Sequence, residues 1–351
     1  MVEVLSSPSL KGDVIARLER QHANVLSFLE NGTGGGDIGV QDCCDVIYSL
    51  FLLGEGGRLA AAAPDAFCDA LAKVDFPGWK ATGKDRLTVH NVAYAFGALN
   101  LLRTITGRDL YGRVLQGREP AFDQLIDGKT GLPLYPRWLA HHNWRVSHWL
   151  GGIPSIFLSL SMADLPDRAA HRARAEALIE RTNRSLDPKT GLIRLYKVKL
   201  LQSAFRLFYG VRHDPDLGDV GGVAHVTWVN HAMGIAYVAN DALCKTAGDL
   251  FLAHSPYMES VPYCLDFDIV QIVRTAMKRN SDAARKYEVR AREMMRSIED
   301  FFSGEVPEGY TLHKLPGALA TYHECLLLAG GTGALGSGMK AIDIITAANW
   351  L

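Results

Sequence analysis

The sequence predicts an all-α protein. Apolar residues recur along most of its 351 residues at the three- and four-residue spacing of helices, and runs that alternate apolar and polar residues are nearly absent. The predicted helices are of two kinds. Some, such as "DRAAHRARAEALIERTNRSL" (167–186), are charged on one face and belong on the outside of a domain. Others, such as "NVAYAFGALNLL" (91–102), are apolar almost all round and belong in its interior.

The order of charged and apolar helices along the chain predicts how the helices are arranged. We expect helices at 13–30, 39–53, 57–73, 88–105, 109–126, 143–163, 167–186, 220–238, 240–253, 263–278, 283–303 and 313–329, and a short last one within 337–349. Outer and inner helices alternate, six of each, which is the count of an (α/α)6 toroid. We therefore expect one domain over 1–351, with an inserted loop around 193–219 that holds a helical piece.

An internal repeat favours such an array of helical hairpins. "LIDGKTGLPLY" (125–135) and "SLDPKTGLIRLY" (185–196) each close an outer helix, and each precedes an inner helix. In both, the Asp can accept hydrogen bonds from backbone amides and the Gly can take a positive φ. The repeat predicts the same turn at two places in the ring.

Composition excludes several classes of function. The net charge is −1 without a long basic run, which argues against electrostatic nucleic-acid binding. The longest apolar runs are too short to cross a bilayer, and the N-terminus lacks the pattern of a secretory signal, so we expect a cytoplasmic protein without a membrane partner. Six cysteines without a CxxC pair are typical of reduced thiols.

The inner helices of a toroid run parallel, so their N-termini open on one mouth, where unpaired N–H groups favour polar ligands. Unusual side chains do gather at these predicted fronts, most densely in "HHNWRVSHWLGG" (141–152). Trp144 and His148 share a helical stripe there, and Trp228 is three residues from both His225 and His231. The expected substrate-binding residues are His90, Asn91, Asn143, Trp144, Arg145, Trp149, Trp228 and His231.

"YCLDFDIVQIV" holds an acidic pair within an apolar segment. Burial would raise the pKa of one carboxyl, the property that a general acid needs, although either Asp could instead cap the helix. We expect His148 and Asp268 to face the mouth at similar depth and to act as a pair. The expected catalytic residues are Asp266, Asp268, His148, His225 and Tyr263.

The sequence predicts no metal site and no other cofactor. It has no H-E-x-x-H motif and no two histidines four residues apart. Its two Gly-rich stretches are neither Walker loops nor dinucleotide-binding turns.

The chain resembles the (α/α)6-toroid proteins. "DPKTGL" before an inner helix is similar to turns of six-hairpin glycosidases, whose relatives include polysaccharide lyases, and "GGVAHVTW" with "PYCLDFDIV" is similar to terpenoid cyclase or prenyltransferase toroids. The first resemblance implies a carbohydrate-active enzyme with an oligosaccharide or glycoconjugate as substrate, since Trp and Tyr side chains stack on sugars.

Two reactions fit this hypothesis. Hydrolysis would use Asp266 or Asp268 as acid, with Asp37 or Asp42 opposite. Elimination would use Asn143 and Arg145 to neutralise a uronate, with His148 or Tyr263 as base.

Two alternatives remain open. A terpenoid-cyclase-like enzyme would use Asp266 or Asp268 to protonate an alkene, although "LDFDI" has Ile269 where the cyclase motif DxDD has a third carboxylate, and DDxxD is absent. The other alternative is a toroid that binds a ligand or partner without catalysis.

Overall fold

The computed structural model describes residues 10–33, 38–74, 88–135, 140–196, 198–211, 215–253, 264–278, 282–330 and 340–351. Within these ranges the regular elements are helices, which confirms the predicted all-α class. The α-helices are α1 (Leu10–Gln21), α2 (Ala23–Asn31), α3 (Val40–Leu52), α4 (Ala63–Ala72), α5 (Val89–Thr106), α6 (Tyr111–Leu115), α7 (Asn143–Leu150), α8 (Gly152–Met162), α9 (Arg168–Arg184), α10 (Lys199–Phe208), α11 (Pro215–Met233), α12 (Asn240–Ala253), α13 (Cys264–Ala276), α14 (Asp282–Ser303), α15 (Lys314–Leu328) and α16 (Ile344–Ala348). Two 3-10 helices, η1 (Gly56–Leu59) and η2 (Glu119–Leu125), complete the set.

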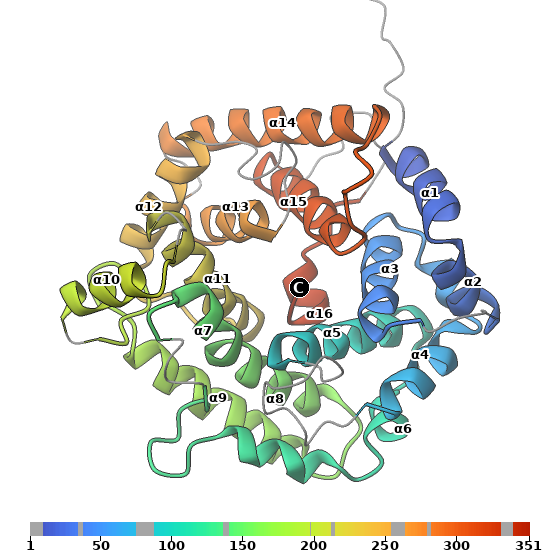
Figure 1. The fold of residues 1–351 in the computed structure, drawn as a ribbon, viewed down its shortest axis with the longest axis horizontal. Coiled ribbons are helices and arrows are strands. Elements are labelled where there is room, and N and C mark those ends of the chain that lie inside the picture. The colour runs from blue at the N-terminus through green and yellow to red at the C-terminus, as the bar shows by residue number, and fades with distance from the viewer. Residues whose placement is uncertain are drawn as a thin grey trace, which may run out of the picture.

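The inner helices contact one another in a cycle. Helix α3 contacts α5, α5 contacts α7 and α8, α7 contacts α11, α11 contacts α13, α13 contacts α15, and α15 returns to α3. Helices α9, α12 and α14 pack outside α8, α13 and α15. Figure 1 shows these two groups around a centre that holds α16.

Apolar patterning explains which helices lie inside. Every residue of α5 from Val92 to Leu102 is buried, and so is α15 from Leu315 to Leu326. Helix α9 buries only one narrow face, and its arginines and glutamates are exposed or half-buried. Burial of the inner helices against several neighbours is the main favourable contribution to the fold.

Four of the predicted helices are divided in the structure, among them 57–73, which is η1 followed by α4. The expected helix 13–30 is α1 and α2, separated at His22, whose φ of −129° is not helical. The expected helix 109–126 is α6 and η2, because Gln116 and Gly117 take positive φ values of 51° and 82° between them.

The expected helix 143–163 bends between α7 and α8, at Gly151. A Cβ on Gly151 would lie 2.2 Å from the carbonyl oxygen of His225, so only glycine permits this contact with α11. Gly222 likewise approaches the backbone of Asn143. These glycines serve close packing of the two helices.

The repeated turns form as predicted. Asp127 Oδ1 accepts hydrogen bonds from the backbone amides of Lys129 (2.8 Å) and Thr130 (2.9 Å), and Gly131 has φ +64°. Asp187 caps its turn in the same way, and both turns are closed by an isolated antiparallel bridge.

Residues 340–351 lie among the inner helices (Figure 1). Helix α16 contacts α5 and α11, and Trp350 behind it is fully buried. The Tyr48 hydroxyl donates to the Trp350 carbonyl oxygen (2.7 Å), and the Ser155 hydroxyl donates to that of Asn349 (3.0 Å). These contacts place the Trp350 indole between the inner helices.

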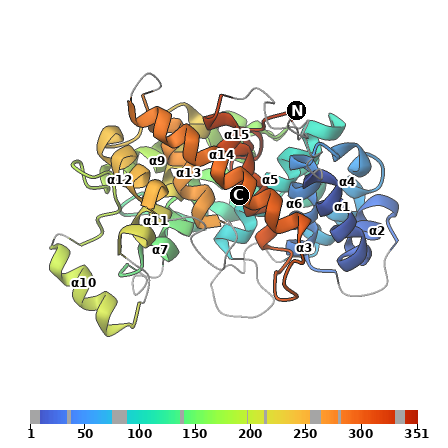
Figure 2. The same cartoon turned by 90° about the horizontal axis from the view of Figure 1, so that it is seen from above.

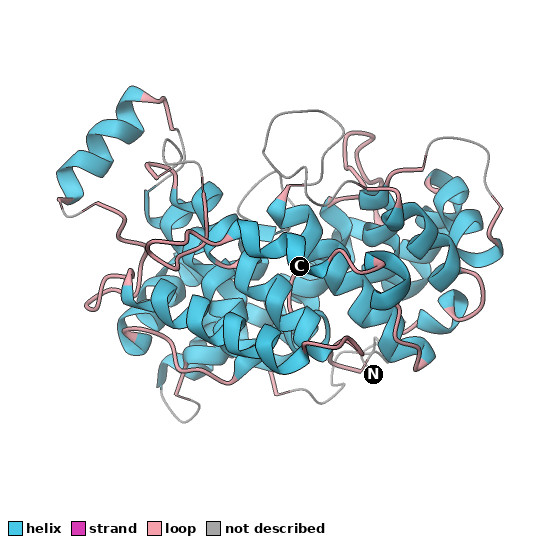
Figure 3. Cartoon of the chain, turned by 90° about the horizontal axis from the view of Figure 1, so that it is seen from below, coloured by secondary structure: helices cyan, strands magenta, loops and turns pink. Residues whose placement is uncertain are grey.

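The expected insertion around 193–219 holds α10, and α11 begins at Pro215, five residues before the predicted start at 220. Figures 2 and 3 show α10 projecting from the body of the molecule. None of the described helices has the length and hydropathy needed to cross a membrane.

Candidate metal centre

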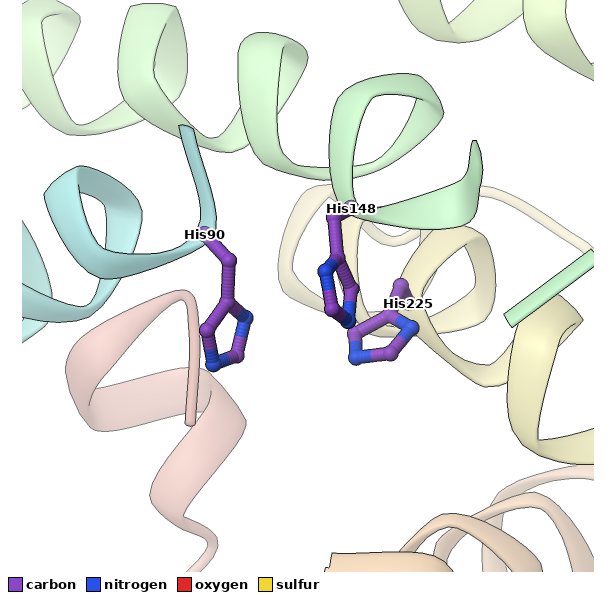
Figure 4. Close-up of side chains that lie close together, drawn as sticks. All are labelled: His90, His148 and His225. Atoms are coloured by element: carbon purple, nitrogen blue, oxygen red, sulfur yellow. The ribbon is translucent and has the colours of Figure 1, made fainter. Parts of the chain in front are cut away.

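Three histidines from three inner helices meet in the structure. His90 on α5, His148 on α7 and His225 on α11 each offer one nitrogen, and these nitrogens lie within 4.8 Å of one another. Figure 4 shows the three rings turned toward a common point. All three were predicted as site residues, but a shared metal site was not predicted.

Local structure fixes each ring. His90 is the second residue of α5, whose N-cap Thr88 accepts a hydrogen bond from the Asn91 amide (3.2 Å). His148 lies on the last turn of α7, and the close contact at Gly151 brings this turn against α11 and His225. The trio is therefore held by helix packing.

Burial favours the neutral form of the three imidazoles. It lowers the pKa of each well below the usual histidine value, and the neighbouring histidines lower it further. His225 is buried, and His90 and His148 are half-buried. Neutral imidazole is the form that binds metal ions.

The hydrogen bonds of His225 define its tautomer. Ser147 Oγ donates its proton to the Trp144 carbonyl oxygen (2.5 Å), so it accepts from His225 Nδ1 (2.8 Å). His225 Nε2 then carries the lone pair. A metal-binding histidine usually donates its other N–H to a fixed acceptor in this way.

His90 is held by Trp350. The indole Nε1–H, which can only donate, lies 3.1 Å from His90 Nδ1, so this nitrogen accepts and neutral His90 carries its proton on Nε2. The Trp350 ring also stacks on His225, with centroids 5.1 Å apart. Trp350 was not predicted as a site residue, because "AANWL" gives no local sign that this tryptophan lies among the inner helices.

The described contacts of His148 are with rings. Its imidazole stacks on His90 (centroids 4.6 Å, 26°) and meets His225 edge-on (4.9 Å, 89°). The Trp149 ring lies 6.5 Å away. No hydrogen bond to a described residue occupies its ring nitrogens, which leaves a lone pair for a ligand.

A second polar cluster adjoins the trio. Buried Asp45 on α3 accepts hydrogen bonds at Oδ1 from the Tyr94 hydroxyl (2.9 Å) and from His313 Nδ1 (3.0 Å). The Asp45 carboxylate raises the pKa of His313, which favours an imidazolium–carboxylate pair. Tyr94 stacks on His90 at 6.3 Å and so joins the two clusters. Asp42 lies beside this pair, and burial followed by Asp45 raises its pKa.

Asp268 is a buried carboxyl group without a hydrogen bond. Neither of its oxygens has a hydrogen-bond partner among the described residues, so Asp268 neither caps α13 nor forms a hydrogen bond with His148. Burial, followed by Asp266, raises its pKa well above the usual aspartate value. It packs against Gly221, one turn before His225 on the same face of α11. Asp266 is also buried.

The other predicted binding residues of α5 and α7 differ from one another in how far they are buried. Asn143 is buried, donates to Asp219 (2.8 Å) and accepts from Gln202, so its amide is committed to the protein. Trp144, Trp149 and Asn91 are half-buried, and Arg145 is exposed. Of this set, the half-buried and exposed side chains are the ones that a ligand could reach.

Trp228 and His231 do not join the mouth as expected. Trp228 meets His225 edge-on with centroids 4.6 Å apart, but it is 1 % exposed and also packs against Phe267 and Trp350, which leaves no ring face for a sugar. His231 lies near the opposite end of α11, where Nε2 is 2.7 Å from Asp343 Oδ2. Tyr263 and Asp37 lie outside the described residues.

Two cavities open at the C-terminal ends of inner helices, away from the trio. One of about 540 Å³ is lined by Arg103 and Met162 among others, and one of about 280 Å³ by His231 and Tyr237 among others. Neither is lined by a histidine of the trio. The convergence of the trio is therefore the stronger indication of a functional site.

No family model, curated protein or solved structure matches this chain.

Proposed function

We propose that this chain is a metal-dependent hydrolase of the (α/α)6-toroid type, with His90, His148 and His225 as ligands of one divalent transition metal ion. The observation that carries the proposal is the approach of three neutral imidazole nitrogens to within 4.8 Å of one another. The cyclic contacts of the inner helices support the toroid.

Zinc suits this set of ligands best. Three histidines that leave a fourth position open are typical of catalytic zinc sites. With zinc–nitrogen bonds of about 2.0–2.1 Å, tetrahedral ligand nitrogens lie about 3.3 Å apart, so the rings would close in by up to about 1.5 Å. A bound metal lowers the pKa of a water molecule and supplies hydroxide as a nucleophile.

The surroundings support hydrolysis over elimination. Elimination would use Asn143 to neutralise a uronate, but its amide bonds Asp219 and Gln202. His225 is held by Ser147 in the tautomer that presents Nε2 to a metal ion. These contacts leave metal-activated water as the better-supported reaction.

A carbohydrate remains the proposed substrate class, as an oligosaccharide or glycoconjugate. Half-buried Trp144 and Trp149 stand on the same short helix as His148 and are the aromatic side chains that could stack on a sugar. Exposed Arg145 adds a donor beside them.

Asp268 supports a second candidate, a terpenoid-cyclase-like enzyme. A carboxyl group that burial keeps protonated, with no hydrogen bond to either oxygen, is the kind of acid that could protonate an alkene. This candidate needs Asp268 and no metal, so the two proposals differ in the residues on which activity depends.

Metal binding by the full-length protein tests the proposal. The protein is stripped with a chelator, incubated with zinc, desalted and analysed for metal content by mass spectrometry. We expect one zinc ion per wild-type chain, and a loss of binding in His90→Gln, His148→Gln and His225→Gln.

His171→Gln is the matched control, because His171 is buried on outer helix α9, away from the trio. It should retain the metal, and melting temperatures should show that all variants are folded. A wild-type protein without stoichiometric zinc, or folded trio variants that keep it, would refute the metal centre. Glycan libraries then test the substrate class, since elimination produces an ultraviolet-absorbing product and hydrolysis does not.

A further inference from the structure

Helix α10 exposes an apolar stripe to solvent. Of the ten large hydrophobic side chains that are exposed among the described residues, seven lie in Val198–Tyr209. Leu200, Leu207 and Phe208 are 76 %, 84 % and 80 % exposed. With Leu201 and Ala204 they cover an arc of about 120° on a helix that turns 100° per residue. Such a stripe normally faces a core, and its exposure marks an interaction surface.

The opposite face of α10 fixes the helix to the body. Gln202 donates to Asn143, and Arg206 forms an ion pair with Asp219 at 2.8 Å. The Tyr209 ring stacks on His141 with centroids 4.1 Å apart. The apolar stripe is thus held outward by contacts on the other side of the same helix (Figures 2 and 3).

The charge of the residues around α10 indicates what kind of partner covers the apolar stripe. Residues 191–213 contain five Lys and Arg and no Asp or Glu, although the whole chain has a net charge of −1 and Asp214 and Asp216 follow directly. Two of the five cations, Arg194 and Arg206, form ion pairs with Asp187 and Asp219. A short helix with Leu and Phe on one face and cationic residues around it is typical of helices that lie in the headgroup region of a bilayer. Anionic lipids attract such a segment.

We propose that α10 binds the surface of an anionic membrane, with Leu200, Leu207 and Phe208 inserted among the lipids. At ten residues the helix is too short to span a bilayer and would lie in its plane. A second copy of the chain is less suited to cover the apolar stripe, because pairing two such stripes would bring the same cationic segments together. The proposal is independent of the metal centre.

Vesicle binding by the full-length protein tests this inference. The protein is sedimented with vesicles of phosphatidylcholine alone or mixed with phosphatidylglycerol. We expect binding to the anionic vesicles, weakened by added salt. The double variant Leu207→Glu/Phe208→Glu should reduce the bound fraction about tenfold or more.

The control variant is Leu252→Glu/Val289→Glu, which changes two exposed apolar residues on α12 and α14 and should bind as wild type does. Light scattering is measured in parallel. Absence of wild-type binding to anionic vesicles, or equal binding by the α10 variant, would overturn the proposal. A wild-type dimer that the α10 variant abolishes, without vesicle binding, would assign the stripe to a second copy.

Discussion

Replacing Asp268 with Asn should change how stability depends on pH. In the folded protein burial raises the pKa of Asp268 well above its usual value, whereas the unfolded chain ionises near pH 4. Between these two pKa values the folded state holds a proton that the unfolded state has lost. The free energy of unfolding therefore falls as pH rises through this window, by about 1.4 kcal/mol per pH unit from this group alone.

Asn has nearly the same shape and does not titrate, so the variant lacks this contribution. We expect wild type and Asp268→Asn to differ little below about pH 4 and to diverge in the variant's favour as pH rises. Urea unfolding at several pH values measures the difference in the free energy of unfolding between the two proteins. The contributions of the other titrating groups are common to both proteins and cancel in this difference. Exposed Asp241 is the control: Lys278 lowers its pKa, so Asp241→Asn should give a flat difference above about pH 5. A flat difference for Asp268→Asn would refute the assignment of a protonated carboxyl.

Two further predictions concern the trio and a buried ion pair. Trp350→Phe should tighten zinc binding about 2- to 12-fold, as measured by competition with a chelator. The reason is that the indole hydrogen bond, a neutral one of about 0.5–1.5 kcal/mol, no longer competes with zinc for the lone pair of His90. Weaker zinc binding by a folded variant would contradict this prediction. Arg274→Met should lower the free energy of unfolding by about 3–5 kcal/mol, because it leaves fully buried Glu324 without its bidentate partner. Urea unfolding should show that the double variant Arg274→Met/Glu324→Leu regains stability relative to Arg274→Met. If Arg274→Met alone lowers the free energy of unfolding by less than about 1 kcal/mol, the ion pair contributes little to stability.

The order of the helices could be predicted from the sequence because burial is a local signal. Helix α9 carries charges along one face, whereas the charged residue of α5, Arg103, stands in its last turn, so their places outside and inside follow from periodicity. The break at His22 and the left-handed Gln116 were not predicted, because neither residue is a strong helix breaker.

The candidate site was predictable only in part. His90, His148 and His225 were each named from their places at the fronts of inner helices, but their meeting depends on how three helices pack. Spacing rules for metal ligands detect pairs on one helix, and these three stand 58 and 77 residues apart in the sequence. Trp228 lies beside His225 as predicted, but it is buried against Phe267 and Trp350 instead of facing a ligand.

Closure of the ring has a consequence for the order of folding. Each helical hairpin can form from neighbouring residues, but the seam between α3 and α15 joins Asp45 to His313 and Leu52 to His323, 268 and 271 residues apart. The Tyr48 hydroxyl reaches the Trp350 carbonyl across 302 residues. Contacts at such separation form only after the intervening chain has lost most of its freedom. On this topology a nascent chain would pass through an open arc of hairpins, and His90 would acquire its Trp350 partner only when the arc closes.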